Sequence, residues 1–163
     1  MDAMPRIEIS TMVHAPQEVV FDLARSIDAH RYSQARHGEK AVAGRTSGLI
    51  ELGESVTWEA VHFGVRQRLT SRITAFERPG YFRDSMVAGA FKRFDHDHSL
   101  VRLGPNTTLM RDVFDFTSPL GAIGRVADLL FLERYMISLL TERNRKLKEL
   151  AESNAYAQFL SAS

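Results

Sequence analysis

The segment LGAIGRVADLLFLERYMISLLTERNRKLKELA, from Leu120 to Ala151, determines how the rest of the chain must pack. Its apolar residues recur every three or four positions, which predicts one long α-helix. Ser118 and Pro119 provide an N-cap and a first-turn proline for this helix. The apolar positions are Ile123, Val126, Leu130, Leu132, Tyr135, Met136, Leu139, Leu140, Leu147 and Leu150. Because its first half is apolar on nearly every side, the helix needs a large apolar partner surface.

The middle of the chain predicts a β-sheet as that partner. If Phe63-Gly64 is a two-residue turn, His62 faces Val65 and Trp58 faces Leu69 across an antiparallel ladder. This register collects one mainly apolar face from Val56, Trp58, Ala60, Gln67, Leu69 and Ser71. The opposite face pairs Glu59 with Arg68 and points to solvent.

A second predicted hairpin brings polar residues into the apolar face. With Gly104-Pro105-Asn106 as the turn, His98 faces Asp112 and His96 faces Phe114. Pro79-Gly80 marks the preceding turn, after which Phe82, Asp84 and Met86 lie on the same side. The interior is therefore predicted to be apolar with a polar cluster at its centre, formed by Asp84, His96, His98 and Asp112, with Gln67, Ser71 and His62 near it.

The N-terminal third predicts a strand followed by two short helices. Residues Arg6–Val13 alternate as a strand, Ala15-Pro16 opens a helix, and Ile27–Gln34 forms a second helical segment. A further strand is expected near Lys40–Val42. We expect a single domain over residues 1–152 and a loosely held tail over 153–163.

Composition excludes several classes of function. The 163 residues carry a net charge of +1 with acids and bases interspersed, so nucleic acid is not an expected partner. The absence of cysteine excludes disulfides and thiolate catalysis. The N-terminus has no apolar signal region, and the apolar part of the long helix is interrupted by Arg125, Asp128, Glu133 and Arg134. We therefore expect a cytoplasmic protein with no membrane span, and either a monomer or a homo-oligomer.

The order of these elements resembles the START-like, or Bet v 1-like, helix-grip superfamily. The resemblance rests on Ala15-Pro16 with Val20-Phe21, on residues 56–60 through 62–64, and on Ser118-Pro119-Leu120-Gly121. It is strongest to bacterial members grouped as SRPBCC, or polyketide cyclase/dehydrase-like, proteins. The resemblance implies an α+β helix-grip fold: a curved antiparallel β-sheet wrapped around a long C-terminal α-helix, with two short N-terminal helices. It also implies a cavity between the sheet and the long helix, without naming the ligand.

Three functions are compatible with that cavity. The first is binding of a small hydrophobic ligand of lipid, polyketide or aromatic/isoprenoid type. The second is a cyclase or dehydratase with His98, Asp112, His96 and Asp84 as candidate acid–base residues. The third is a protein-interaction module with a filled cavity. The predicted ligand-binding residues are Trp58, His62, Gln67, Leu69, Phe82, Asp84, Met86, Phe94, His96, His98, Met110, Asp112, Phe114, Phe131 and Tyr135.

The two histidines also have the residue type of metal ligands. His96 and His98 lie two residues apart on one strand face, beside Asp84 and Asp112. However, the resembling fold does not usually carry a metal, and four buried polar side chains can satisfy one another. The sequence therefore predicts neither a tightly bound metal nor a cofactor.

Overall fold

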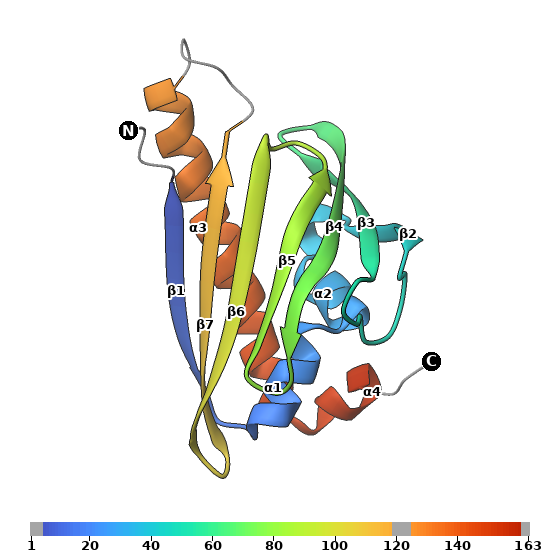
Figure 1. The fold of residues 1–163 in the computed structure, drawn as a ribbon, viewed down its shortest axis with the longest axis vertical. Helices are drawn as coiled ribbons and strands as arrows, with labels where there is room; N and C mark the ends of the chain where they lie inside the picture. The colour runs from blue at the N-terminus through green and yellow to red at the C-terminus, as the bar shows by residue number, and fades with distance from the viewer. Residues whose placement is uncertain (1–4, 119–124, 161–163) are drawn as a thin grey trace.

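The computed structural model describes residues 5–118 and 125–160, and these form one curved antiparallel sheet with a long helix across one face (Figure 1). The seven strands have the order β1-β7-β6-β5-β4-β3-β2. Their bounds are β1 Arg6–Val13, β2 Lys40–Gly44, β3 Ser55–His62, β4 Val65–Glu77, β5 Tyr81–Ala88, β6 Arg93–Gly104 and β7 Thr107–Thr117. The predicted helix-grip architecture is confirmed.

The long helix α3 spans Arg125–Ala151 and lies across the sheet (Figure 1). Leu140, Leu147 and Leu150 are buried, as the apolar stripe requires. The predicted end at Ala151 is confirmed. The predicted first turn, from Pro119, lies outside the described residues.

Both predicted hairpin registers are confirmed residue by residue. In the β3–β4 hairpin Trp58 pairs with Leu69, and in the β6–β7 hairpin His98 pairs with Asp112. Phe63 (φ 53°) and Gly64 (φ 73°) both adopt the left-handed conformation that a two-residue hairpin turn needs. Because side chains alternate across a strand, these registers fix which residues face the helix.

The short helices α1, Gln17–Ala24, and α2, Ile27–Ser33, agree with the prediction. A single 3₁₀ turn, η1, follows at Ala35–His37. Phe21 of α1 is fully buried, with its ring 5.4 Å from those of Phe76 and Phe82. This contact anchors α1 in a core cluster at one end of the sheet, while Ile7, Phe94, Phe114, Phe116 and Leu140 form a second cluster.

The chain after α3 differs from the loosely held tail that we expected. The 3₁₀ turn η2, Asn154–Tyr156, and helix α4, Ala157–Leu160, fold back against the first core cluster. The Ser26 hydroxyl donates a hydrogen bond to the carbonyl oxygen of Phe159 at 3.0 Å. The expectation failed because the apolar side chains of Tyr156, Phe159 and Leu160 pack on the core. Among the described helices, none combines the length and apolar character needed to traverse a bilayer.

Candidate functional site

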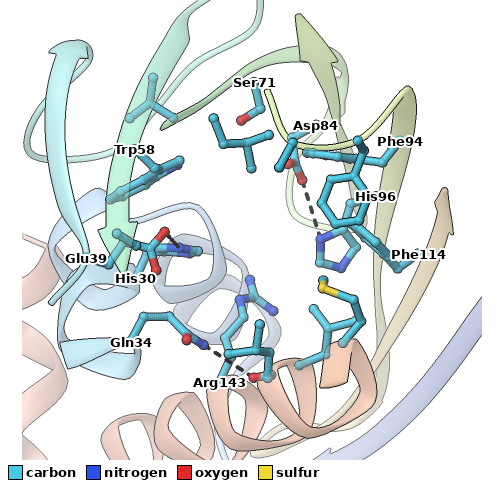
Figure 2. A pocket seen from close by; sticks show the side chains of 18 of the residues that line it. His30, Gln34, Glu39, Trp58, Ser71, Asp84, Phe94, His96, Phe114 and Arg143 are labelled. Atoms are coloured by element: carbon cyan, nitrogen blue, oxygen red, sulfur yellow. Dashed lines mark hydrogen bonds and ion pairs between the residues drawn. The ribbon is translucent and has the colours of Figure 1, made fainter. Parts of the chain in front are cut away.

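A cavity of about 480 Å³ lies between the concave face of the sheet and α3 (Figure 2). This volume is in the range of small-molecule sites. Twelve of the predicted residues line it: Trp58, His62, Gln67, Leu69, Phe82, Asp84, Phe94, His96, His98, Phe114, Phe131 and Tyr135. The walls are therefore mainly apolar and aromatic, with a few polar groups.

Three residues that we predicted to contact a ligand do not line the cavity. Met110 is fully buried in the first core cluster, and Met86 packs against the second. Asp112 is 1% exposed and lies behind the two histidines. The register correctly placed all three on the inner face, but packing determines which inner residues remain open to the cavity.

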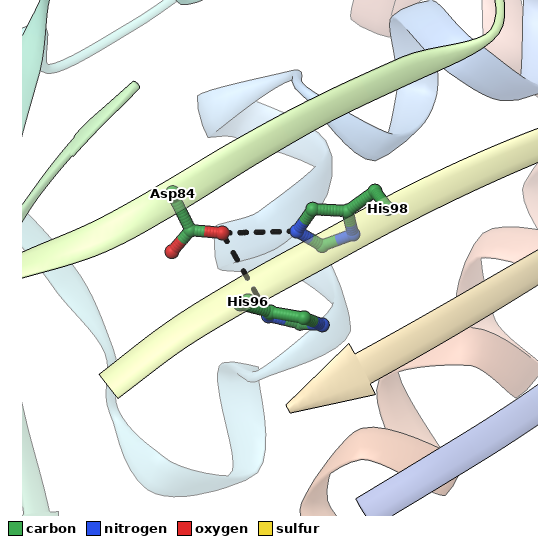
Figure 3. A group of neighbouring side chains, drawn as sticks. All are labelled: Asp84, His96 and His98. Carbon is green, nitrogen blue, oxygen red and sulfur yellow. Dashed lines mark hydrogen bonds and ion pairs between the residues drawn. The ribbon is translucent and has the colours of Figure 1, made fainter. Parts of the chain in front are cut away.

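The two histidines bind two carboxylates (Figure 3 shows one of them, Asp84). His96 Nε2 lies 2.9 Å from Asp112 Oδ1, and His98 Nε2 lies 2.9 Å from Asp84 Oδ1. His98 Nδ1 is also 2.9 Å from Asp112 Oδ1, but this buried nitrogen has no well-directed hydrogen bond among the described residues. The predicted contact of His98 with Asp112 is present, whereas of the two histidines it is His96 that makes the directed hydrogen bond to Asp112.

Helix α3 adds two residues to this network that we did not predict. Asn144 Nδ2 donates to Asp112 Oδ2 at 2.6 Å, and Arg143 Nη1 lies 3.3 Å from Asp112 Oδ1. Arg143 also donates to the carbonyl oxygen of Ala24 at 3.2 Å and lines the cavity. A signal for Arg143 was present in the sequence, because it lies four residues before Leu147 and three after Leu140, within the apolar stripe.

Mutual pairing sets the charges of this network. Burial alone would raise the pKa of Asp112, but the hydrogen bond from His96 and the close contacts of His98 and Arg143 hold it well below its usual range. Burial alone would also raise the pKa of Asp84, but the hydrogen bond from His98 and the nearby charges of the histidines and Arg143 together lower it. Burial opposes a charge on His98, yet contacts with both carboxylates raise its pKa. Two anions, Asp84 and Asp112, thus face two cations, His98 and Arg143.

His96 is the neutral member of the network. Burial lowers its pKa, and the neighbouring charge of His98 lowers it further. A neutral ring that donates from Nε2 to Asp112 has a lone pair on Nδ1, which lies 3.7 Å from Asp84 Oδ1. His96 and Asp84 both line the cavity, so this end of the site can accept hydrogen bonds from a ligand.

The opposite wall carries a second polar group. His30 Nε2 lies 3.1 Å from Glu39 Oε1, and the His30 ring lies against Trp58 at 4.3 Å (Figure 2). Gln34 Nε2 donates to the carbonyl oxygen of Leu139 at 3.3 Å. Sequence reasoning missed these residues. Although a short helical segment from Ile27 was predicted, its pattern does not define which of its side chains face the cavity.

The tip of the β3–β4 hairpin contacts α3 at the edge of the cavity. His62 Nδ1 lies 2.5 Å from the Tyr135 hydroxyl, and the Phe63 ring lies 4.5 Å from that of Tyr135 and 5.3 Å from that of Phe131. All four residues line the cavity. These contacts join the hairpin to the helix beside the cavity.

This contact should weaken in acid. Burial lowers the pKa of His62, and the nearby His37 lowers it further, while Glu39 has a smaller opposing effect. In the unfolded chain His62 has a pKa of about 6.5. Below that pH the unfolded chain binds more protons than the folded one, so stability falls as the pH falls.

We expect urea unfolding at pH 7.5, 6.5 and 5.5 to show that the free energy of unfolding decreases as the pH falls. His62→Gln should lose less stability over the same interval, and the difference between the two proteins isolates His62 from other titrating groups. Parallel pH dependence in the two proteins would contradict the expectation.

Solved structures share this architecture at low sequence identity. The Zhui aromatase/cyclase from Streptomyces sp. R1128 superposes with a TM-score of 0.74 at 15% identity, covering 92% of this chain and 94% of its own. A START superfamily protein from Mycobacterium smegmatis gives 0.69 at 14% identity, covering 90% and 97%. Major latex-like protein 151 from Panax ginseng gives 0.64 at 12% identity, covering 92% and 99%.

By sequence, the chain matches no protein-family model and no curated protein. The structural likenesses therefore concern the fold. They establish that this chain adopts the helix-grip fold found in START-like and Bet v 1-like proteins.

Proposed function

We propose that the protein binds a small, mainly hydrophobic molecule in the cavity between the sheet and α3. The observation that carries this proposal is a cavity of about 480 Å³ with mainly apolar walls and a few convergent polar groups. A pure protein-interaction module would have a cavity filled by its own side chains. The open volume does not agree with that alternative.

The two walls suggest the kind of ligand. Trp58 lies on one side, and Phe94 and Phe114 lie on the other (Figure 2). Aromatic side chains favour flat or ring-containing ligands through offset and edge contacts. His96 and Asp84 would accept hydrogen bonds from a hydroxyl at one end of such a ligand. A lipid, polyketide or aromatic/isoprenoid molecule with one hydroxylated end fits this distribution.

A second candidate function is cyclisation or dehydration of a carbonyl substrate. Asp84 is ionised and His96 is neutral, and both face the cavity. A carboxylate beside a neutral imidazole can remove a proton next to a carbonyl group and return one to a leaving hydroxyl. The similarity to the Zhui aromatase/cyclase adds weight to this candidate. Turnover of a polyketone would separate it from simple binding.

Binding can be tested with an environment-sensitive apolar dye. We expect saturable binding of one dye per chain, weakened roughly 3- to 10-fold by Trp58→Ala, because an aromatic contact contributes about 0.5–1.5 kcal/mol. Fluorescence titration measures the affinity, and native mass spectrometry of the purified protein detects any ligand that it retains.

Tyr32→Ala is the matched control. Tyr32 is an aromatic residue that is 45% exposed and is absent from the cavity lining. Dye binding no stronger than to a compact control protein, or equal losses in both variants, would count against a ligand cavity.

A further inference from the structure

We propose that Asp84, His96 and His98 together bind one divalent transition-metal ion at the cavity wall (Figure 3). The sequence led us to expect no metal, because the two histidines and the two carboxylates beside them can satisfy one another. The structure supplies the third ligand from β5 and a shared support for both imidazoles from β7.

The spacing of the donor atoms suits an ion. Asp84 Oδ1 lies 2.9 Å from His98 Nε2 and 3.7 Å from His96 Nδ1, and all three donors lie within 4.8 Å of one another. Metal–ligand distances of about 2.0–2.2 Å separate neighbouring ligand atoms by roughly 2.8–3.6 Å in octahedral or tetrahedral sites. The separation of 2.9 Å lies within this range and that of 3.7 Å lies just above it, so small side-chain adjustments would complete the site.

The other nitrogen of each histidine supports the same assignment. His96 Nε2 and His98 Nδ1 each lie 2.9 Å from Asp112 Oδ1. Histidines that bind metals almost always donate their second ring N–H to a carboxylate, a carbonyl or water, which fixes the tautomer. Here one carboxylate can fix both rings, leaving His96 Nδ1 and His98 Nε2 to face Asp84.

Asp112 is itself held in place from α3. Asn144 donates to its Oδ2, and the Arg143 guanidinium lies beside its Oδ1. The buried His98 Nδ1 has no well-directed hydrogen bond among the described residues. A small rotation of the ring would direct this N–H to Asp112 and move Nε2 toward the ion.

Two histidines and one carboxylate leave coordination positions open toward the cavity. This ligand set is typical of non-haem iron(II) and of zinc sites that keep a water ligand. In the metal-free protein the position between His98 and Asp84 holds a proton, which the ion replaces. Exchanging one proton for a divalent cation adds one positive charge, so the open position should favour an anionic oxygen, such as hydroxide or an enolate.

The test uses chelator-stripped full-length protein with Zn²⁺ in calorimetry and Co²⁺ in visible absorption. We expect one equivalent of each ion, with cobalt d–d bands that report coordination. Asp84→Asn and His98→Ala should each weaken binding by at least 100-fold. Asp112→Asn should weaken it about 10- to 100-fold through the orientation of the histidines.

His14→Gln is the control, because it removes an exposed histidine that belongs neither to the cavity lining nor to the cluster. Unfolding midpoints of the stripped proteins show whether each variant remains folded. Binding of less than 0.2 equivalents, or equal binding by wild type, Asp84→Asn and His98→Ala, would overturn the proposal. The apolar-dye titration is carried out on metal-free protein and does not depend on metal binding. The two measurements therefore distinguish failure of the metal site from failure of the proposed ligand cavity.

Discussion

Replacing Asp112 with alanine is expected to lower the free energy of unfolding by about 3 to 5 kcal/mol, as removal of one partner from a buried charged pair typically does. Asp112 is 1% exposed, and its carboxylate faces the cations His98 and Arg143. The variant would leave both cations buried with only Asp84 to balance them. It would also remove the nearer of two acceptors for the Asn144 amide, leaving the Thr11 hydroxyl at 3.5 Å.

Asp115→Ala provides the matched control for chemical denaturation. Asp115 is on the same strand but on the outer face, where it pairs with Arg93 at 3.0 Å. Partly exposed ion pairs contribute about 0–1 kcal/mol, so this variant should lose little stability. Similar losses in the two variants would show that the network of Asp112 does not stabilise the fold.

A double-mutant cycle tests whether Asp112 is coupled more strongly to His98 or to Arg143. From the sequence alone, Asp112→Leu with His98→Leu should recover much of the lost stability, because replacing both members of the facing pair leaves no unpaired buried charge. The structure predicts better recovery from Asp112→Leu with Arg143→Leu, since the Asp84–His98 hydrogen bond at 2.9 Å then remains. Additive effects of Asp112→Leu and Arg143→Leu would contradict this coupling.

The strand registers were predictable because turn chemistry and period-two alternation act together. Phe63-Gly64 fixes one hairpin, and the turn at Gly104 to Asn106 fixes another. Once a turn is placed, a slip by one residue would move Trp58 and Leu69 to solvent. Local sequence therefore contained enough information to bring His96, His98, Asp84 and Asp112 to one face.

The contribution of α3 to the site was harder to predict, because helical periodicity does not define how a helix crosses a sheet. Arg143 and Asn144 lie in the charged half of the helix, where charged residues usually face solvent. Both are buried because Asp112 lies opposite and accepts their hydrogen bonds. Contacts between segments far apart in the sequence also bury Asp112 behind the histidines, away from the cavity. Such contacts likewise place His30 and Glu39 on the wall opposite His96.

Substituting tryptophan for Ala60 should weaken binding of the apolar dye by at least tenfold. Ala60 is 6% exposed and lines the cavity from β3, so an indole at this position would occupy space that the ligand needs. Because the indole enters open volume, stability should change by no more than the roughly 1–3 kcal/mol that overpacking costs.

The neighbouring variant Val61→Trp distinguishes occupation of the cavity from a general effect of tryptophan. Val61 is the next residue on β3, points to the opposite face and is 49% exposed. Fluorescence titration of both variants, with unfolding midpoints measured in parallel, should show loss of affinity in Ala60→Trp and near wild-type affinity in Val61→Trp. If a folded Ala60→Trp variant keeps full affinity, the dye binds outside the cavity, because the inner face of β3 would then be irrelevant to binding.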